Sequence, residues 1–262
     1  MTIAYEAHGD GSAVLLVHEG VADRRMWRGQ VPVLARDHRV VAVDLRGFGE
    51  TPNASGPFSH ADDLREVLDE VGIERATVVG GSLGAKVALQ FALMNPGRVE
   101  RLVLCPPVLP GWEWSERVRR GWQEEEEAYE AGDLDRATEV NVELWVDGPG
   151  RGPDAVDAEV RDLVRTMQRR AFELPEPDPP PEPAPDLAVR LADVRAPTLV
   201  VVGDEDVEDF LAMADTVAAG IPGARKVVVE GAAHVVALEK PEEFNRALLD
   251  FLSDPATYTS TE

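Results

Sequence analysis

Cysteine, basic charge and long apolar runs are all scarce in this chain of 262 residues. Cys105 is the only cysteine, so no disulfide can form within the chain. It closes the apolar run 102–105, a position that predicts a buried thiol acting as a small hydrophobic residue. No apolar run approaches the roughly 20 residues of a membrane-spanning helix, and residues 1–6 lack the basic start and apolar core of a signal peptide. We therefore expect a cytoplasmic protein.

The shortage of basic residues is large. Lys and Arg number 26 against 49 Asp and Glu, which gives a net charge of -23. Such a field opposes binding to nucleic acid and to anionic membranes, so we expect neither partner. It also disfavours strongly anionic substrates unless a basic pocket compensates. The five histidines are scattered without metal-ligand spacing, so no metal and no other cofactor is expected.

Strand-length apolar runs alternate with helical patterns along most of the chain. The runs predict strands at 13–17, 39–43, 76–79, 99–105, 198–202 and 226–229, and the helices at 62–71, 85–94, 210–219 and 241–252. Continuous apolar strands suit a sheet that is covered on both faces. The alternation predicts an α/β fold with a doubly wound, mostly parallel sheet.

The alternation of strand and helix patterns stops after residue 106. Residues 112–172 have helical patterns, and the run of glutamates at 124–127 predicts a solvated helix face. Seven prolines in 174–186 predict a stiff, extended connector. We therefore expect a core of residues 1–108 and 187–262, interrupted by a helical lid and its Pro-rich connector at 109–186.

The segment Gly80-Gly81-Ser82-Leu83-Gly84 lies between the predicted strand 76–79 and the predicted helix 85–94. A Gly-x-Ser-x-Gly pattern in this context predicts a sharp turn that exposes the serine hydroxyl, which makes Ser82 a candidate nucleophile. The amide of Leu83 would begin the helix unpaired and face incoming negative charge. The alternative is a glycine-rich turn with an incidental serine.

Other predicted strands also end in polar residues, and parallel strands bring these ends together. His18, Glu19 and Gly20 follow the first strand, and Asp206 and His234 follow the last two. A serine hydroxyl needs a neutral imidazole to take its proton, and a carboxylate to hold that imidazole in place. Ser82, His234 and Asp206 fit these roles, and the nearby acids Asp204, Glu205 and Asp209 are alternatives to Asp206.

Taken together, the segments 15–20, 44–49, 80–84, 203–206 and 231–234 make the chain resemble the α/β-hydrolase fold family, in its group of esterases, lactonases and C–C hydrolases. The family pattern Gly-x-x-Asp selects Asp206. The resemblance also implies that His18 braces the loop after the first strand. That loop would supply the second oxyanion-hole amide, from Gly20 or Val21. The family usually has glycine directly after this histidine, whereas Glu19 stands there in this chain. Its carboxylate either points to solvent or borders the pocket and disfavours anionic substrates.

Four of the five tryptophans fall in the inserted segment: Trp112, Trp114, Trp122 and Trp145. Their large apolar area suits a pocket roof, although any one of them could belong to a small core of the lid itself. Further candidates for the pocket wall are Met26, Leu109, Met167, Phe172 and Val207. We therefore expect a serine hydrolase for a neutral, apolar or aromatic ester or lactone. A C–C bond hydrolase, a cofactor-free perhydrolase and a ligand-binding protein with little turnover are the alternatives.

Overall fold

The computed structural model describes residues 3–53, 56–175 and 187–254. Its sheet has seven strands in the order β1-β3-β2-β4-β5-β6-β7. The strands are β1 (Tyr5–His8), β2 (Ser12–Val17), β3 (His38–Val43), β4 (Ala76–Gly80), β5 (Val99–Leu104), β6 (Thr198–Gly203) and β7 (Arg225–Val229). Only β1 pairs antiparallel, with β3; the other described pairs are parallel. The predicted α/β fold with a mostly parallel sheet is therefore confirmed.

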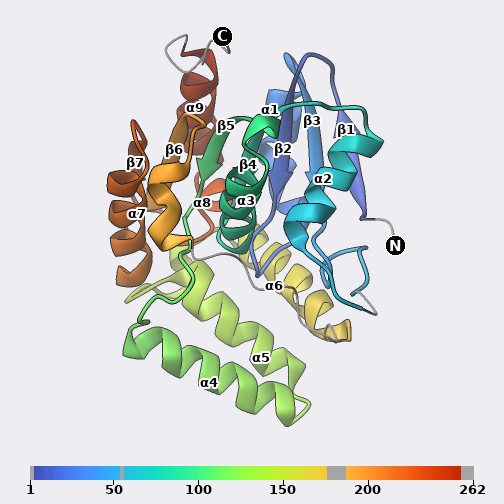
Figure 1. Ribbon diagram of the computed structural model, residues 1–262. Helices are drawn as coiled ribbons and strands as arrows, with labels where there is room; N and C mark the ends of the chain where they lie inside the picture. The colour runs from blue at the N-terminus through green and yellow to red at the C-terminus, as the bar shows by residue number, and fades with distance from the viewer. Residues whose placement is uncertain (1–2, 54–55, 176–186, 255–262) are drawn as a thin grey trace.

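Helices cover both faces of the sheet (Figure 1). The longer ones are α2 (His60–Glu70), α3 (Leu83–Met94), α7 (Glu208–Gly220) and α9 (Pro241–Ser253). Shorter helical segments are η1 (Arg24–Gly29), α1 (Val31–Leu34), η2 (Pro96–Arg98), η5 (Ala188–Asp193) and α8 (Val236–Glu239). Because the sheet is covered on both faces, β4 and β6 are buried along their whole length. The edge strand β1 is mostly exposed and carries no apolar run, which is why the sequence pattern did not predict it.

A helical segment is inserted between β5 and β6. It consists of α4 (Glu116–Glu130), α5 (Leu134–Asn141), the π-helix η3 (Val142–Asp147), η4 (Pro153–Ala155) and α6 (Ala158–Glu173). Side chains of Ser115, Asp133 and Asp157 cap the starts of its three α-helices. The predicted Pro-rich connector at 174–186 lies outside the described residues except for Leu174 and Pro175. In Figure 1 the inserted helices lie together beyond one end of the sheet, opposite the C-terminus.

The turn between β4 and α3 is tight because two glycines let backbones pass close together. A Cβ atom on Gly80 would lie 2.3 Å from the carbonyl oxygen of Gly84, and one on Gly84 would lie 2.4 Å from that of Val17. Between them, Ser82 adopts φ 46° and ψ −109°, the one non-glycine residue with positive φ in the described chain. Such a backbone costs on the order of 1–3 kcal/mol and is typical of functional sites.

We expect the Gly84→Ala substitution to destabilise the protein by roughly 1–3 kcal/mol or more, although alanine is the better helix former. The reason is that the new methyl group would meet the backbone oxygens of Val17 and His18, at 2.4 and 2.5 Å. Urea unfolding measures the loss. Gly97→Ala is the matched control, because a Cβ atom there meets nothing within 4 Å. Equal stability of the two variants would contradict this account of the turn.

Cys105 is 1% exposed, and burial raises the pKa of its thiol well above the ordinary value. This confirms the prediction of a buried, unreactive cysteine. Within the described ranges of the chain, every helix is too short or too polar to cross a membrane.

Candidate active site

His234 and Asp206 form a buried pair at the carboxyl ends of the strands. Nδ1 of His234 lies 3.0 Å from Oδ2 and 3.3 Å from Oδ1 of Asp206, and the two residues are 3% and 5% exposed. Because an ionised carboxylate only accepts, Nδ1 carries the proton and Nε2 is left free to accept one. Burial opposes the charged imidazolium, but the Asp206 carboxylate outweighs it and raises the pKa of His234.

Two aromatic rings hold the imidazole of His234 from its other sides. The ring of Phe210, in the first turn of α7, lies 4.3 Å from it between centroids, and that of Trp145 lies 4.9 Å away. Trp145 comes from the π-helix η3, and its Nε1 donates to Oδ1 of Asn141 at 3.1 Å. A π-helix widens one turn and is often found at functional sites. Here it brings an indole of the inserted segment onto the histidine.

Ser82 and His234 line the same cavity, which has a volume of about 280 Å³. The other lining residues are Gly20, Val21, Leu83, Lys86, Val108, Trp114, Trp122, Glu125, Asn141, Trp145, Gln168 and Phe210. Among the residues that the structure describes, no hydrogen bond joins Ser82 to His234. Such bonds are often long before a substrate is bound, so their absence does not separate the two groups chemically.

The predicted oxyanion-hole residues Leu83, Gly20 and Val21 all line this cavity. Gly20 and Leu83 are neighbours, since a Cβ atom on Gly20 would lie 3.6 Å from that of Leu83. His18 braces the loop that carries Gly20. Its Nε2 accepts from the amide of Leu45 at 2.9 Å, so Nδ1 carries the proton and donates to the carbonyl of Glu19 at 2.7 Å.

The structure brings only part of the predicted pocket wall to the cavity. Trp114, Trp122 and Trp145 line it. Trp112, Met167 and Val207 lie elsewhere. Trp112 packs half-buried against the core, the sulfur of Met167 contacts the amide of Asp23 at 3.4 Å, and the buried Val207 donates its amide to Asp206 at 2.8 Å. Apolar character alone does not tell which face of the inserted helices looks onto the cavity.

Several cavity residues were missed by the sequence interpretation. Lys86 lies one helical turn after Ser82, so helix spacing could have found it. Glu125 is the half-buried member of the run that was predicted to be solvated, and burial raises its pKa. Gln168 is 5% exposed and its Oε1 has no partner among the described residues. Phe210 has the clearest signal, as an aromatic residue four positions after the predicted acid.

Glu19 lies neither in solvent nor on the cavity wall, so both expectations for its carboxylate differ from the structure. The residue is 0% exposed and does not line the cavity that holds Ser82. Neither carboxyl oxygen has a hydrogen-bond partner among the described residues. Burial, opposed by His234 and reinforced by Asp206, raises its pKa from 4.5 to about 8.

This carboxyl group makes the folded state sensitive to pH. Between pH 4.5 and about 8 it is ionised in the unfolded chain but protonated in the folded one. The folded state binds more protons in that window, so stability falls as pH rises through it. At about 1.4 kcal/mol per pKa unit, the cost at pH 7 is roughly 3 kcal/mol. A buried group with such a cost and no partner is typical of a functional site.

The alternative acids near Asp206 have other partners. Asp204 accepts from the amide of Gly231 at 2.6 Å, and Asp209 accepts from the amide of Ser115, at the start of α4, at 2.8 Å. Glu205 is exposed. In the described part of the chain, no group of three or more His, Cys, Asp or Glu side chains is arranged to hold a metal ion.

A second compartment of about 600 Å³ shares part of its wall with the Ser82 cavity. The shared residues are Gly20, Leu83, Trp122, Glu125 and Gln168. His60 also lines it, although the sequence around His60 looks like a surface segment. Burial lowers the pKa of His60 to about 4. The aromatic side chains of Phe48, Phe58, Tyr129 and Phe172 also face this space.

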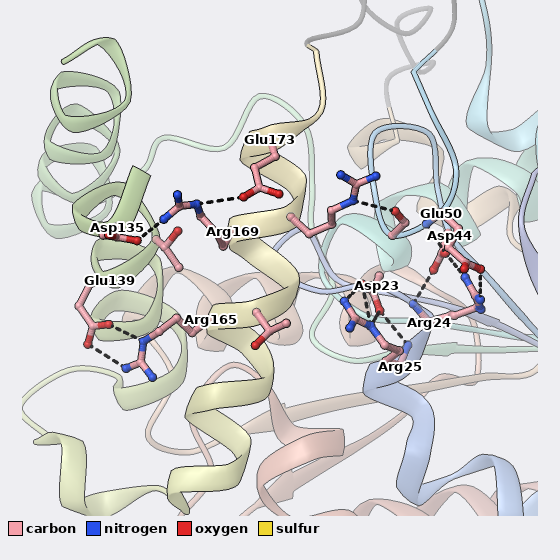
Figure 2. A pocket seen from close by; sticks show the side chains of 14 residues that line it. Asp23, Arg24, Arg25, Asp44, Glu50, Asp135, Glu139, Arg165, Arg169 and Glu173 are labelled. Carbon is pink, nitrogen blue, oxygen red and sulfur yellow. Dashed lines mark hydrogen bonds and ion pairs between the residues drawn. The ribbon is translucent and has the colours of Figure 1, made fainter. Parts of the chain in front are cut away.

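A further cavity, of about 930 Å³, is lined by neither Ser82 nor His234. Figure 2 shows it beside α6 and the segments around Arg24 and Glu50, with ion pairs among the side chains that line it. Arg169 pairs with Asp135 and Glu173, and Arg24 pairs with Glu50. Most of the charged side chains that line this space are therefore paired within the protein, whereas Arg170, among the described residues, donates only to the carbonyl oxygen of Gly49, at 3.4 Å.

Comparisons with known proteins agree with the observed fold. Residues 8–247 match the model of the alpha/beta hydrolase family. The 2-hydroxy-6-oxononadienedioate/2-hydroxy-6-oxononatrienedioate hydrolase 2 of Pseudomonas putida is 29% identical, over 96% of this chain and 92% of that protein. The structure of Est816, described as an N-acyl homoserine lactone degrading enzyme, superimposes with a TM-score of 0.76 at 26% identity and covers 95% of this chain and 96% of that one. A thermophilic esterase from Thermogutta terrifontis gives a TM-score of 0.78 at 27% identity, with coverage of 98% and 94%. The chain therefore belongs to the alpha/beta hydrolase family and is an α/β-fold hydrolase.

Proposed function

We propose that this protein is a serine hydrolase that cleaves a neutral, apolar or aromatic carboxylic ester or lactone through an acyl-enzyme. One observation supports this above the others. A buried His234, oriented by Asp206 at 3.0 Å, shares a cavity with Ser82, which a strained turn exposes at the start of α3. Those are the groups that covalent catalysis by serine requires.

The reaction would begin when Nε2 of His234 takes the hydroxyl proton as Oγ of Ser82 attacks the substrate carbonyl. The amide of Leu83, with that of Gly20 or Val21, would donate to the oxyanion of the tetrahedral intermediate, each worth about 3 kcal/mol. His234 then gives its proton to the leaving alkoxide, and the acyl-enzyme forms. Water, activated by the same imidazole, releases the acid. Asp206 keeps its charge throughout and stabilises the imidazolium.

The apolar part of the cavity wall supports the proposed substrate class. Three indoles and the ring of Phe210 surround the space near Ser82 and His234, and Val21 and Val108 add apolar surface. Such walls favour an apolar or aromatic acyl or alcohol group. The second compartment, which shares Leu83 with the first, offers room for the remainder of a longer substrate.

We also propose that the inserted segment acts as a lid, which makes residues 109–186 a separate functional unit from the core at 1–108 and 187–262. Trp114, Trp122 and Trp145 belong to this segment and line the cavity. A cover of this kind excludes water from the acyl-enzyme and strengthens the electrostatic interactions beneath it.

C–C bond hydrolysis is the second candidate. The relative from Pseudomonas putida is named as a hydrolase of 2-hydroxy-6-oxo dicarboxylates. Such a reaction would use the same serine and histidine, since fold and side chains do not determine the leaving group. Assays with a vinylogous 1,5-diketone acid and with a matched ester separate the two reactions. Faster turnover of the diketone would replace the ester proposal.

A fluorophosphonate probe tests the proposed function directly. We expect the folded protein to take up one probe per chain, at Ser82, because the activated hydroxyl attacks phosphorus as it attacks a carbonyl carbon. Mass spectrometry of the peptide that contains Ser82 measures this, and urea-unfolded protein is the control that should stay unlabelled. A folded protein that stays unlabelled would contradict the proposal and favour a ligand-binding role.

A further inference from the structure

The carboxyl group of Glu19 is buried near the candidate active site, and the proposed mechanism does not use it. It follows His18 on the loop after β2, and the next residue, Gly20, is a candidate oxyanion donor. The side chain is fully buried, and both of its oxygens lack a partner among the described residues. The protein therefore keeps an unpaired acid beside its candidate active site at a cost in stability.

The position of Glu19 is defined by the turn that carries Ser82. A Cβ atom on Gly81 would lie 2.5 Å from Cγ of Glu19, 3.0 Å from its Oε1 and 3.1 Å from the carbonyl oxygen of Cys105. Glycine at position 81 thus leaves the space that the carboxyl group fills. The side chain lies directly against the turn, one residue before Ser82 and two before Leu83.

The titratable groups that face Glu19 come from three other elements. His234 lies on the loop after β7 and Asp206 on the loop after β6, and both interact electrostatically with this carboxyl group. Cys105, directly after β5, is the third; burial raises the pKa of its thiol, and a charge on Glu19 would raise it further. A negative charge on Glu19 would therefore add to that of Asp206, in a place where neither has access to water.

We propose, on the basis of the proposed serine mechanism, that Glu19 is a positioning residue that must keep its proton for turnover. As a neutral group it fills the space under the Ser82 turn and leaves Asp206 as the anion beside His234. Once ionised, it would put an unpaired negative charge against Gly81, two residues before Leu83, on the turn that carries a candidate oxyanion donor. The oxyanion has only backbone dipoles to stabilise it there, so the reaction would slow. The imidazolium gains less, because Asp206 already pairs with it.

The pH dependence of kcat/KM for a p-nitrophenyl ester, from pH 5 to 10, tests this role. We expect the wild type to lose activity at both ends, with the alkaline decline centred near pH 8. Glu19→Gln has a neutral side chain of the same shape and should lack the alkaline decline or show it at least one pH unit higher. Glu205→Gln makes the same change on an exposed residue next to Asp206 and should keep the wild-type profile.

Thermal unfolding gives a measurement that does not depend on turnover. The Tm of Glu19→Gln should exceed that of the wild type by a margin that grows from pH 5 to about pH 8 and then levels off. A margin that stays constant with pH would show that Glu19 is not protonated in the fold and would overturn the proposal. Glu19→Met, neutral and similar in length, serves if the glutamine variant does not fold.

The outcomes separate this inference from the proposed function. If the wild-type protein neither hydrolyses esters nor reacts with fluorophosphonate, both the proposed function and the role of Glu19 would be contradicted. Normal labelling of Ser82 with an unchanged alkaline decline in Glu19→Gln would overturn only the role of Glu19. A shift confined to the acidic limb would do the same, because it would mean that Glu19 acts on His234 and not on the oxyanion.

Discussion

Replacing Ser82 by alanine should lower kcat for ester hydrolysis on the order of 10⁴-fold to 10⁶-fold. The nucleophile would be gone while the rest of the cavity remained, since Ser82 makes no side-chain hydrogen bond within the described structure. Weak activity should persist, because the amides of Gly20 and Leu83 would still polarise a bound carbonyl. Initial rates with short p-nitrophenyl esters measure the loss.

Two further variants make the Ser82→Ala result specific. Ser253→Ala removes an exposed hydroxyl at the end of α9 and should leave the rate unchanged. The double variant Ser82→Ala/His234→Ala should be no slower than the single one by more than roughly tenfold, because the two groups act as a unit. If Ser82→Ala kept most of the wild-type rate, the proposed mechanism would be wrong.

The Asp206→Asn variant should lower kcat by roughly 10³-fold to 10⁴-fold. The amide NH₂ of asparagine can donate to Nδ1 of His234, which would leave the ring proton on Nε2, the wrong tautomer for taking a proton from Ser82. The acidic limb of the pH profile should also move to lower pH. The reason is that the carboxylate of Asp206 raises the pKa of His234, and the amide would not. The dependence of kcat on pH measures both effects.

Neighbouring acids provide the controls for Asp206→Asn. Glu205→Gln should keep the wild-type rate. Asp209→Asn should affect stability more than the pH profile, because Asp209 accepts from the amide of Ser115 at the start of α4. If Asp209→Asn shifted the acidic limb and Asp206→Asn did not, the assignment of the orienting acid would have to be reversed.

The strands could be predicted because their signal is local. A strand covered on both faces must be apolar at nearly every position, as in β4 and β6, whatever lies on the other side of the sheet. The exposed edge strand β1 lacks that requirement and was missed. The turn at Ser82 could also be predicted from the sequence. Its glycines are required because the backbone passes close to Val17 and to other residues of the turn itself.

Glu19 shows where sequence patterns end. The sequence pattern places Glu19 after His18, in a loop expected near the site. From that position its side chain could point either to solvent or to the pocket. The structure places the side chain of Glu19 against Gly81, with Asp206 and His234 nearby. It is therefore neither in solvent nor on the wall of the pocket. The contacts responsible join residues 62 and more positions apart, and no local pattern records them.

The amino-acid sequence by itself determined the α/β order, the strained serine turn, and the chain order of serine, acid and histidine, because each depends on neighbouring residues and on strand ends meeting at one edge. The tertiary structure decided which carboxylate reaches Nδ1 of His234, which of the inserted tryptophans face Ser82, and that Glu19 is buried without a partner. These depend on side-chain direction in loops and on how the inserted helices pack over the sheet. Both are set by contacts between segments that are distant in the chain.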